Sequence, residues 1–181
     1  NRSNIADKLM DLTLTSNKIV AESGIMRKVI KQVTRISQTD AHVLISGETG
    51  VGKDVIATLI HEISSRRGHN LVRLDCGALS GGLIESELFG SETPAAAGRN
   101  AGRPGLLALA DKSTLFLDKI DEFPYDLQGK LLHAIDDKCY TPMGSSRSVN
   151  SDFRLVAATS KNLPELVREG RFREDLYYRL N

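Results

Sequence analysis

The stretch HVLISGETGVGKDVIATLI, residues 42–60, decides the fold of this chain. A short apolar strand runs into a glycine-rich loop with the G-x-x-x-x-G-K pattern, and a helix follows, which is the setting that a phosphate-binding loop requires. Backbone N–H groups and the helix N-terminus surround phosphates in such loops, and the lysine reaches the β and γ oxygens. The predicted nucleotide-binding residues are Gly47, Glu48, Thr49, Gly50, Val51, Gly52, Lys53 and Asp54. The alternative is a glycine-rich turn with no ligand.

Strands and helices alternate along the rest of the chain. Helical spacing of apolar residues predicts helices over 25–36, 54–65, 83–89 and 127–135. Short apolar runs predict strands at LVRLDC, TLFLD and FRLVAATS, whereas residues 91–103 have hardly an apolar anchor and predict a loop. The sequence therefore indicates an α/β fold, a P-loop NTPase with a parallel sheet and helices on both faces.

Composition narrows the class of protein. The 181 residues carry 24 basic and 23 acidic side chains, a net charge of +1, so this domain is not an electrostatic nucleic-acid binder. DNA contact is expected from a separate domain. No apolar run suits a membrane span and no signal peptide is evident, so a cytoplasmic location is expected.

A second chemical signal lies in STLFLDKIDEF, residues 113–123. The strand delivers Asp118 to its carboxyl end, where open α/β sheets bind ligands. In nucleotide hydrolases of this kind a second acid follows and orients the attacking water, but here the next residue is Lys119. A lysine has only donors and cannot accept a proton from water, and loss of a general base costs about 10²- to 10⁴-fold in rate. We therefore expect impaired ATP hydrolysis.

A family resemblance follows from the order and spacing of seven motifs. GETGVGKD, LDCGAL, ESELFG, TLFLD, DLQGKLL, RLVAATS and EGRFREDLYYRL resemble the AAA+ domain of bacterial enhancer-binding proteins, the sigma-54 activators of the NtrC/PspF class. The resemblance divides the chain into a linker, residues 1–19, and an AAA+ α/β subdomain, residues 20–181. It implies that the helical lid, the N-terminal sensory domain and the DNA-binding domain lie outside this chain.

The resemblance also implies roles for individual residues, with ATP or ADP and Mg²⁺ as cofactors. Asp118 and Asp54 fall on the magnesium side of the site, and Val20 and Ala21 on the adenine pocket. Thr159 and Ser160 fall on the position called sensor I. Arg173 and Arg179 fall on arginines that reach into a neighbouring subunit of a ring; a solvated helix face is the alternative for both.

Three departures from the family pattern shape the expected function. Lys119 replaces the catalytic glutamate and Asp75 replaces the asparagine that holds it, so we expect an ion pair between them in a non-hydrolytic site. Alternatively, Lys119 turns to solvent and Asp75 caps a local turn. The segment Pro94–Arg99 aligns with the loop that contacts sigma-54, but Ala96 and Ala97 replace its aromatic residue and threonine. Productive sigma-54 contact is therefore not expected.

These departures resemble the degenerate branch of the family that includes biofilm regulators such as VpsR. The expected function is a nucleotide-binding module of a transcription regulator, two-component systems included, that self-associates as a dimer or ring and acts with RNA polymerase without sigma-54. Some relatives bind cyclic di-GMP, but the matching place here holds TSNK, residues 15–18. The alternatives are an active ATPase in which Asp121 replaces the missing acid, and a purely structural oligomerisation module.

Overall fold

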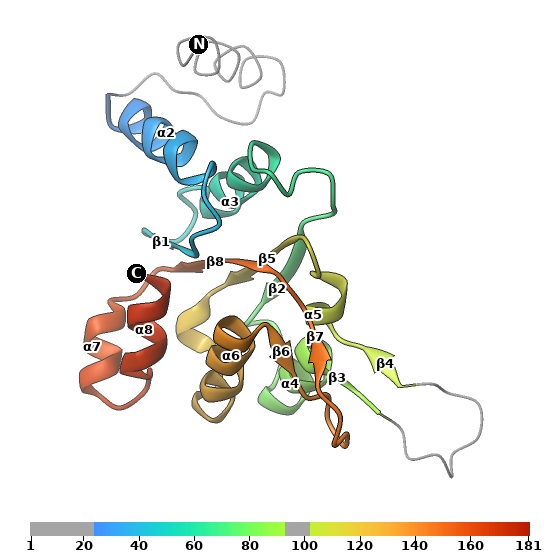
Figure 1. Ribbon diagram of the computed structural model, residues 1–181. Helices are drawn as coiled ribbons and strands as arrows, with labels where there is room; N and C mark the ends of the chain where they lie inside the picture. Colours follow the sequence, from blue (N-terminus) through green and yellow to red (C-terminus); the bar gives the residue numbers. More distant parts are fainter. Residues whose placement is uncertain (1–23, 93–101) are drawn as a thin grey trace.

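Four parallel strands form the central sheet in the order β1-β8-β5-β2. The computed structural model describes residues 24–92 and 102–181 (Figure 1). The sheet strands are β1 (Val43–Ser46), β2 (Val72–Asp75), β5 (Thr114–Asp118) and β8 (Arg154–Thr159). Because all four run in the same direction, their carboxyl ends meet at one edge, and the predicted parallel sheet is confirmed.

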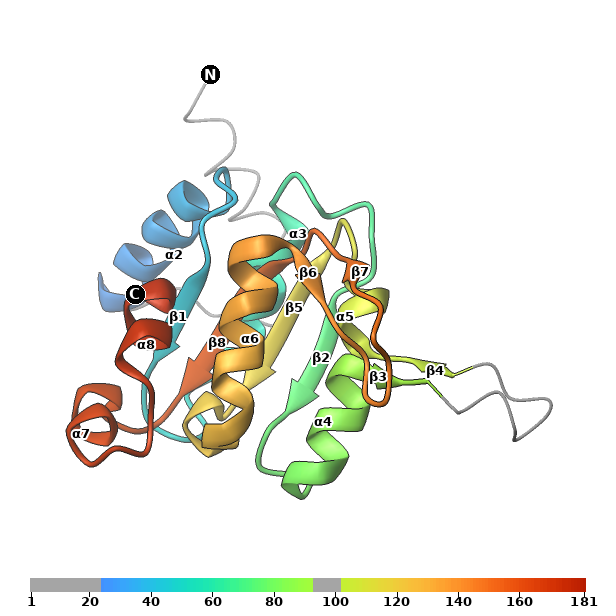
Figure 2. The same ribbon diagram turned by 60° about the horizontal axis from the view of Figure 1, so that its bottom comes forward.

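Helices cover both faces of this sheet (Figures 1 and 2). One face carries α2 (Gly24–Ile36) and α3 (Lys53–Glu62). The other carries α4 (Gly81–Phe89), α5 (Leu106–Leu109), α6 (Tyr125–Asp137), α7 (Leu163–Arg168) and α8 (Glu174–Leu180). A hydrophobic core lies on each face of the sheet, and side chains of β5 alternate between the two cores. Leu115 and Leu117 pack on the α6 side, and Phe116 packs on the α3 side. No helix in the described ranges is long and apolar enough to cross a membrane.

The predicted loop over residues 91–103 begins and ends in a short antiparallel ladder, β3 (Gly90–Ser91) with β4 (Arg103–Pro104). The ladder projects from the body in both views (Figures 1 and 2). Gly90 has φ 75°, and a Cβ there would lie 2.5 Å from the backbone nitrogen of Gly105. Only glycine permits this close approach, so we refer to β3, β4 and Gly105 as the glycine stalk. A second ladder joins β6 (Cys139–Tyr140) to β7 (Val149–Asn150), and a 3₁₀ turn, η2, spans Ile120–Glu122.

One buried arginine holds α2 against the sheet. Arg154, at the start of β8, is 1% exposed and donates hydrogen bonds to three backbone carbonyls. The acceptors are Ile36 at 2.9 Å, Ser37 at 3.5 Å and Ala41 at 3.0 Å. Since the last carbonyls of a helix have no partner within it, Arg154 caps the end of α2.

A cluster of cations surrounds Asp152 at the amino-terminal edge of the sheet. Its carboxylate pairs with Lys138 at 2.9 Å, Lys112 at 3.3 Å and Arg66 at 3.4 Å. The hydrogen bond from Lys138 lowers the pKa of Asp152 to about 2 against the opposing effect of burial, and Lys112 and Arg66 add to the shift. Asp152 therefore links three segments of the chain. Arg66 comes from the segment after α3, Lys112 from the turn before β5, and Lys138 directly follows α6.

Candidate functional site

The phosphate loop lies between β1 and α3 at the carboxyl edge of the sheet. Gly50 and Gly52 adopt left-handed conformations with φ 83° and 86°, which carry the chain around the loop and into the helix. The ammonium group of Lys53 donates to the carbonyls of Gly47 at 2.9 Å and Glu48 at 2.8 Å. Among the described residues, no carboxylate forms an ion pair with Lys53. The loop therefore presents one cation and a helix N-terminus without a fixed acidic partner.

Asp118 ends β5 at the same edge, in register with Asp75 on β2. Its Oδ1 accepts the backbone N–H of Lys119 at 2.9 Å. Lys119 itself is left-handed, with φ 52°, and directly precedes η2 as its N-cap residue. Asp118 thus keeps one carboxylate oxygen free of this local bond and stays only partly buried.

The expected ion pair between Lys119 and Asp75 is present. Lys119 Nζ lies 2.9 Å from Asp75 Oδ2, and this hydrogen bond lowers the pKa of Asp75 and raises the pKa of Lys119. Asp75 Oδ1 also accepts the N–H of Gly77 at 2.9 Å, so the predicted alternative of a local cap holds for Asp75 as well. The stem of Lys119 passes over Gly77, where a Cβ would lie 2.9 Å from Lys119 Cδ.

Asp121 is already occupied by two other side chains. Its side chain is 2% exposed, accepts the Thr159 hydroxyl at 2.6 Å and pairs with Lys161 Nζ at 3.0 Å. Burial alone would raise the pKa of Asp121, but the bonds from Thr159 and Lys161 outweigh it and lower the pKa. This arrangement argues against Asp121 as a replacement catalytic acid. Thr159 faces Asp121, whereas Ser160 beside it is exposed.

The two arginines that resemble intersubunit residues each have a carboxylate partner within this chain. Arg173 pairs with Asp175 at 2.8 Å, and its backbone N–H donates to Gln128 at 2.7 Å. Arg179 pairs with Asp136 at 2.7 Å. Both guanidinium groups remain substantially exposed, so these pairs are weak and open to exchange.

Two sets of predicted residues lie outside the described part of the chain. One set is Val20 and Ala21 of the expected adenine pocket, with residues 15–18 just before them, and the other is the Pro94–Arg99 segment. In residues 24–92 and 102–181, no three His, Cys, Asp or Glu side chains gather closely enough to hold a metal by themselves. Mg²⁺ beside nucleotides is usually held by one or two carboxylates together with phosphate oxygens and water, so such a cluster is not required.

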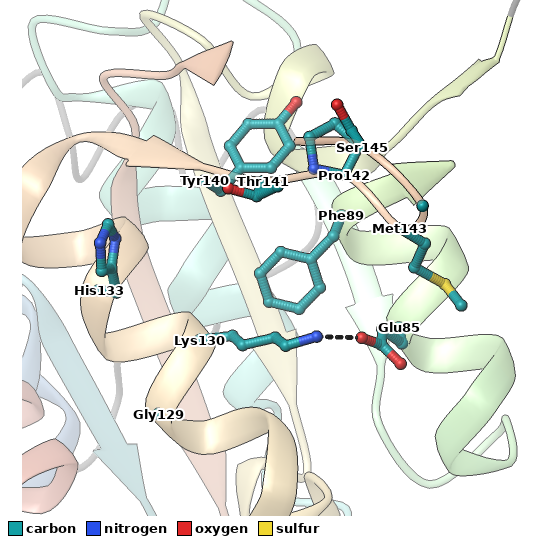
Figure 3. A pocket seen from close by; sticks show the side chains of 11 residues that line it. Glu85, Phe89, Gly129, Lys130, His133, Tyr140, Thr141, Pro142, Met143 and Ser145 are labelled. Carbon is teal, nitrogen blue, oxygen red and sulfur yellow. Dashed lines mark hydrogen bonds and ion pairs between the residues drawn. The ribbon is translucent and has the colours of Figure 1, made fainter. Parts of the chain in front are cut away.

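A cavity of about 560 Å³ lies apart from the phosphate loop, between α4, α6 and the chain that follows Tyr140 (Figure 3). Phe89 and Tyr140 meet there with ring centroids 6.3 Å apart, and Lys130 pairs with Glu85 across the opening. Sequence patterns did not indicate it, because its lining comes from three separate segments. No residue of the loop 47–54 lines it.

A phosphate loop at the carboxyl edge of a parallel sheet, beside a strand that ends in an acid, defines the P-loop NTPase class. Residues 19–181 match the sigma-54 interaction domain, and the chain belongs to this family of AAA+ domains. It is 43% identical over 177 residues to the formate hydrogenlyase transcriptional activator of Salmonella typhimurium, covering 98% of this chain and 26% of that protein. Against the transcriptional regulator VasH of Vibrio cholerae the identity is 42% over 165 residues, 91% of this chain and 31% of VasH.

A solved relative has the same arrangement of elements. The crystal structure of NtrX from Brucella abortus in complex with ADP superposes with a TM-score of 0.84 at 29% identity, covering 95% of this chain and 37% of that one. The chain thus spans about a quarter to two fifths of the length of these relatives.

Proposed function

We propose that this chain is the nucleotide-binding domain of a transcription regulator in which ATP hydrolysis is impaired. The observation that carries the proposal is Lys119, held by Asp75 at 2.9 Å in the position of the missing acid. The family match and the complex of NtrX with ADP support a nucleotide ligand. Cyclic di-GMP is the other candidate ligand, and a binding titration of the protein with cyclic di-GMP beside ATP and ADP tests it.

The residues of the phosphate loop fit a nucleotide. Backbone N–H groups around Gly50 and Gly52 would bind the phosphates, and Lys53 would exchange its two carbonyl partners for phosphate oxygens. Asp118 and Asp54 would hold Mg²⁺, which neutralises phosphate charge when bound. Val20 and Ala21 would contact the adenine.

Neither Lys119 nor Asp121 can act as a general base toward water in this site. Lys119 has no acceptor, and both carboxylate oxygens of Asp121 are engaged by Thr159 and Lys161. The proposal therefore places the chain in the degenerate branch of the family, the branch that includes VpsR. Ala96 and Ala97 in the sigma-54 contact segment support action without sigma-54. Arg173 and Arg179 would exchange their own carboxylates for a neighbouring subunit's site in a dimer or ring, and RNA polymerase and DNA would be reached through other parts of the protein.

The test is ATP turnover by the protein at saturating Mg-ATP, beside the double variant Lys119→Glu with Asp75→Asn. We expect the natural protein to be silent and the double variant to gain about 10²-fold or more, because a general base is restored. Adding Lys53→Ala to the double variant is the control, and it should abolish the gain. Steady turnover by the natural protein, at a rate that the double variant does not exceed, would contradict impaired hydrolysis.

The family match favours a second candidate, an active ATPase of a sigma-54-dependent activator. In that case the natural protein turns over ATP and stimulates transcription by polymerase that carries sigma-54. A reconstituted transcription assay with sigma-54 and with the housekeeping sigma factor separates the two functions.

A further inference from the structure

Lys119 brings a positive charge to a place that is otherwise acidic. Its ammonium group donates a hydrogen bond to Asp75 at 2.9 Å and interacts electrostatically with the carboxylates of Glu122 and Asp118. Those carboxylates would attract a divalent cation to this edge of the sheet. Lys119 therefore supplies, from the chain itself, part of the charge that a metal ion would bring to a bound phosphate.

The topology puts this charge within reach of the phosphate loop. The loop follows β1, Lys119 follows β5, and only β8 lies between the two strands. Neighbouring strands are about 4.8 Å apart, so the two segments lie about 10 Å apart along one edge. The flexible four-carbon stem of a lysine can cover much of that separation.

The bond to Asp75 is one that Lys119 can leave. The side chains of Lys119 and Asp75 are 44% and 40% exposed, and ion pairs this exposed contribute little to stability. Asp75 keeps the N–H of Gly77 after the exchange, so no carboxylate is stranded. A terminal phosphate carries more negative charge than Asp75 and offers several acceptor oxygens to an ammonium group.

We propose that Lys119 determines nucleotide specificity: its Nζ leaves Asp75 for the terminal phosphate of a nucleoside triphosphate, which then binds without a divalent cation. This inference rests on the proposed nucleotide binding. A nucleoside diphosphate ends one phosphate earlier and lacks this contact. In the absence of metal the site should therefore favour ATP over ADP.

The experiment is a titration of the protein with a fluorescent ATP analogue and the matching ADP analogue, in Mg²⁺ and in EDTA. For the natural protein we expect the Kd of the ATP analogue to change less than about threefold on removal of Mg²⁺. In EDTA, Lys119→Met should weaken the ATP analogue about tenfold or more, the loss typical of one charge-assisted hydrogen bond, and leave ADP unchanged.

The chain offers a matched control in Lys138. This residue is also left-handed with φ 52° and pairs with an aspartate, Asp152, at 2.9 Å, but it lies at the opposite edge of the sheet. Lys138→Met should bind both nucleotides as the natural protein does. Asp75→Asn removes the competing carboxylate and should tighten the ATP analogue in EDTA, which tests the exchange from the other side.

The outcomes separate this inference from the proposed function. If Lys119→Met binds the ATP analogue in EDTA as tightly as the natural protein, the inference is wrong and nucleotide binding stands. The inference is also wrong, and nucleotide binding stands, if the natural protein binds the ATP analogue in Mg²⁺ but no longer binds it in EDTA. If the natural protein binds neither analogue in Mg²⁺, both the inference and the proposed function fail.

Discussion

The protonation state of His42, which lies just before β1, is determined by its surroundings. Its Nδ1 accepts the N–H of Leu155 at 3.1 Å. Burial lowers the pKa of His42 from 6.5 to about 4, and the charges of Arg179 and Arg154 add to the effect. The imidazole is therefore neutral in the folded protein at neutral pH, which its accepting role requires.

A pH dependence follows for this residue. Because the folded pKa lies below the unfolded one, the contribution of His42 is fully present above about pH 6.5 and is lost as the pH falls toward 4. We expect His42→Gln, which keeps an acceptor, to remove up to about 3 kcal/mol of the acid-induced loss in the free energy of unfolding. Urea denaturation at about pH 7 and 4.5 measures the difference. If the free energy of unfolding falls as much between these pH values in His42→Gln as in the natural protein, this account is wrong.

Site residues differed in how far the sequence could predict them. Gly47 to Asp54, Asp118 and the pairing of Lys119 with Asp75 were accessible, since each belongs to a motif whose position in the sheet follows from its strand. Lys161 was missed, because its contact with Asp121 joins residues 40 apart that share no motif. Gln128, which fixes the backbone of Arg173, was missed for the same reason.

Among the elements, α2 depends on a side chain that lies far away in the sequence. Replacing Arg154 by methionine keeps the length of the buried stem and removes the guanidinium donors to Ile36, Ser37 and Ala41. The Ile36 carbonyl keeps its bonds from Thr39. We expect a loss of about 2–4 kcal/mol in the free energy of unfolding, because α2 loses the charge-assisted hydrogen bonds that a buried side chain makes to its end. Hydrogen exchange should accelerate within residues 24–36 before other segments.

The control for this prediction is Arg171→Met. Arg171 is 62% exposed and pairs only with the nearby Glu169 in the described contacts, so this change should cost less than about 1 kcal/mol. Equal losses in the two variants would show that the caps on α2 contribute nothing specific.

The strands of the central sheet and the helices α2, α3, α4 and α6 were predictable, whereas the three shortest helices and the two-residue strands were not. The strand TLFLD was predicted at its observed bounds, and the predicted helix 25–36 starts within one residue of α2. The helices α5, α7 and α8 span 4, 6 and 7 residues, too few for a helical period to stand out. The strands β6 and β7 have 2 residues each and depend on their pairing across the chain.

At the scale of the molecule, the cluster around Asp152 links three segments at the amino-terminal edge of the sheet. Since its pKa in the folded state is about 2 against 3.8 in a model peptide, its contribution is present above about pH 4 and is lost as the pH falls toward 2. We expect Asp152→Asn to lower the free energy of unfolding by about 1–2 kcal/mol at neutral pH, allowing for its partial exposure.

The measurement is denaturant unfolding of both proteins across that acid range. The gap between the natural protein and Asp152→Asn should close as the pH falls through the window. This window lies below that of His42, so the two effects can be separated in one titration. A gap that stays constant down to about pH 2 would rule out a role for the charge of Asp152.

The glycine stalk has a consequence for how such a domain can evolve. Gly90 and Gly105 touch backbone to backbone, so the points where the chain leaves and re-enters the body are set by the main chain. The close approach itself is made by main-chain atoms. Selection can therefore rewrite residues 93–101, in sequence and in length, without disturbing the sheet or the phosphate loop. On this plan the chain between the two anchor points can vary while the strands that carry the phosphate loop are inherited intact.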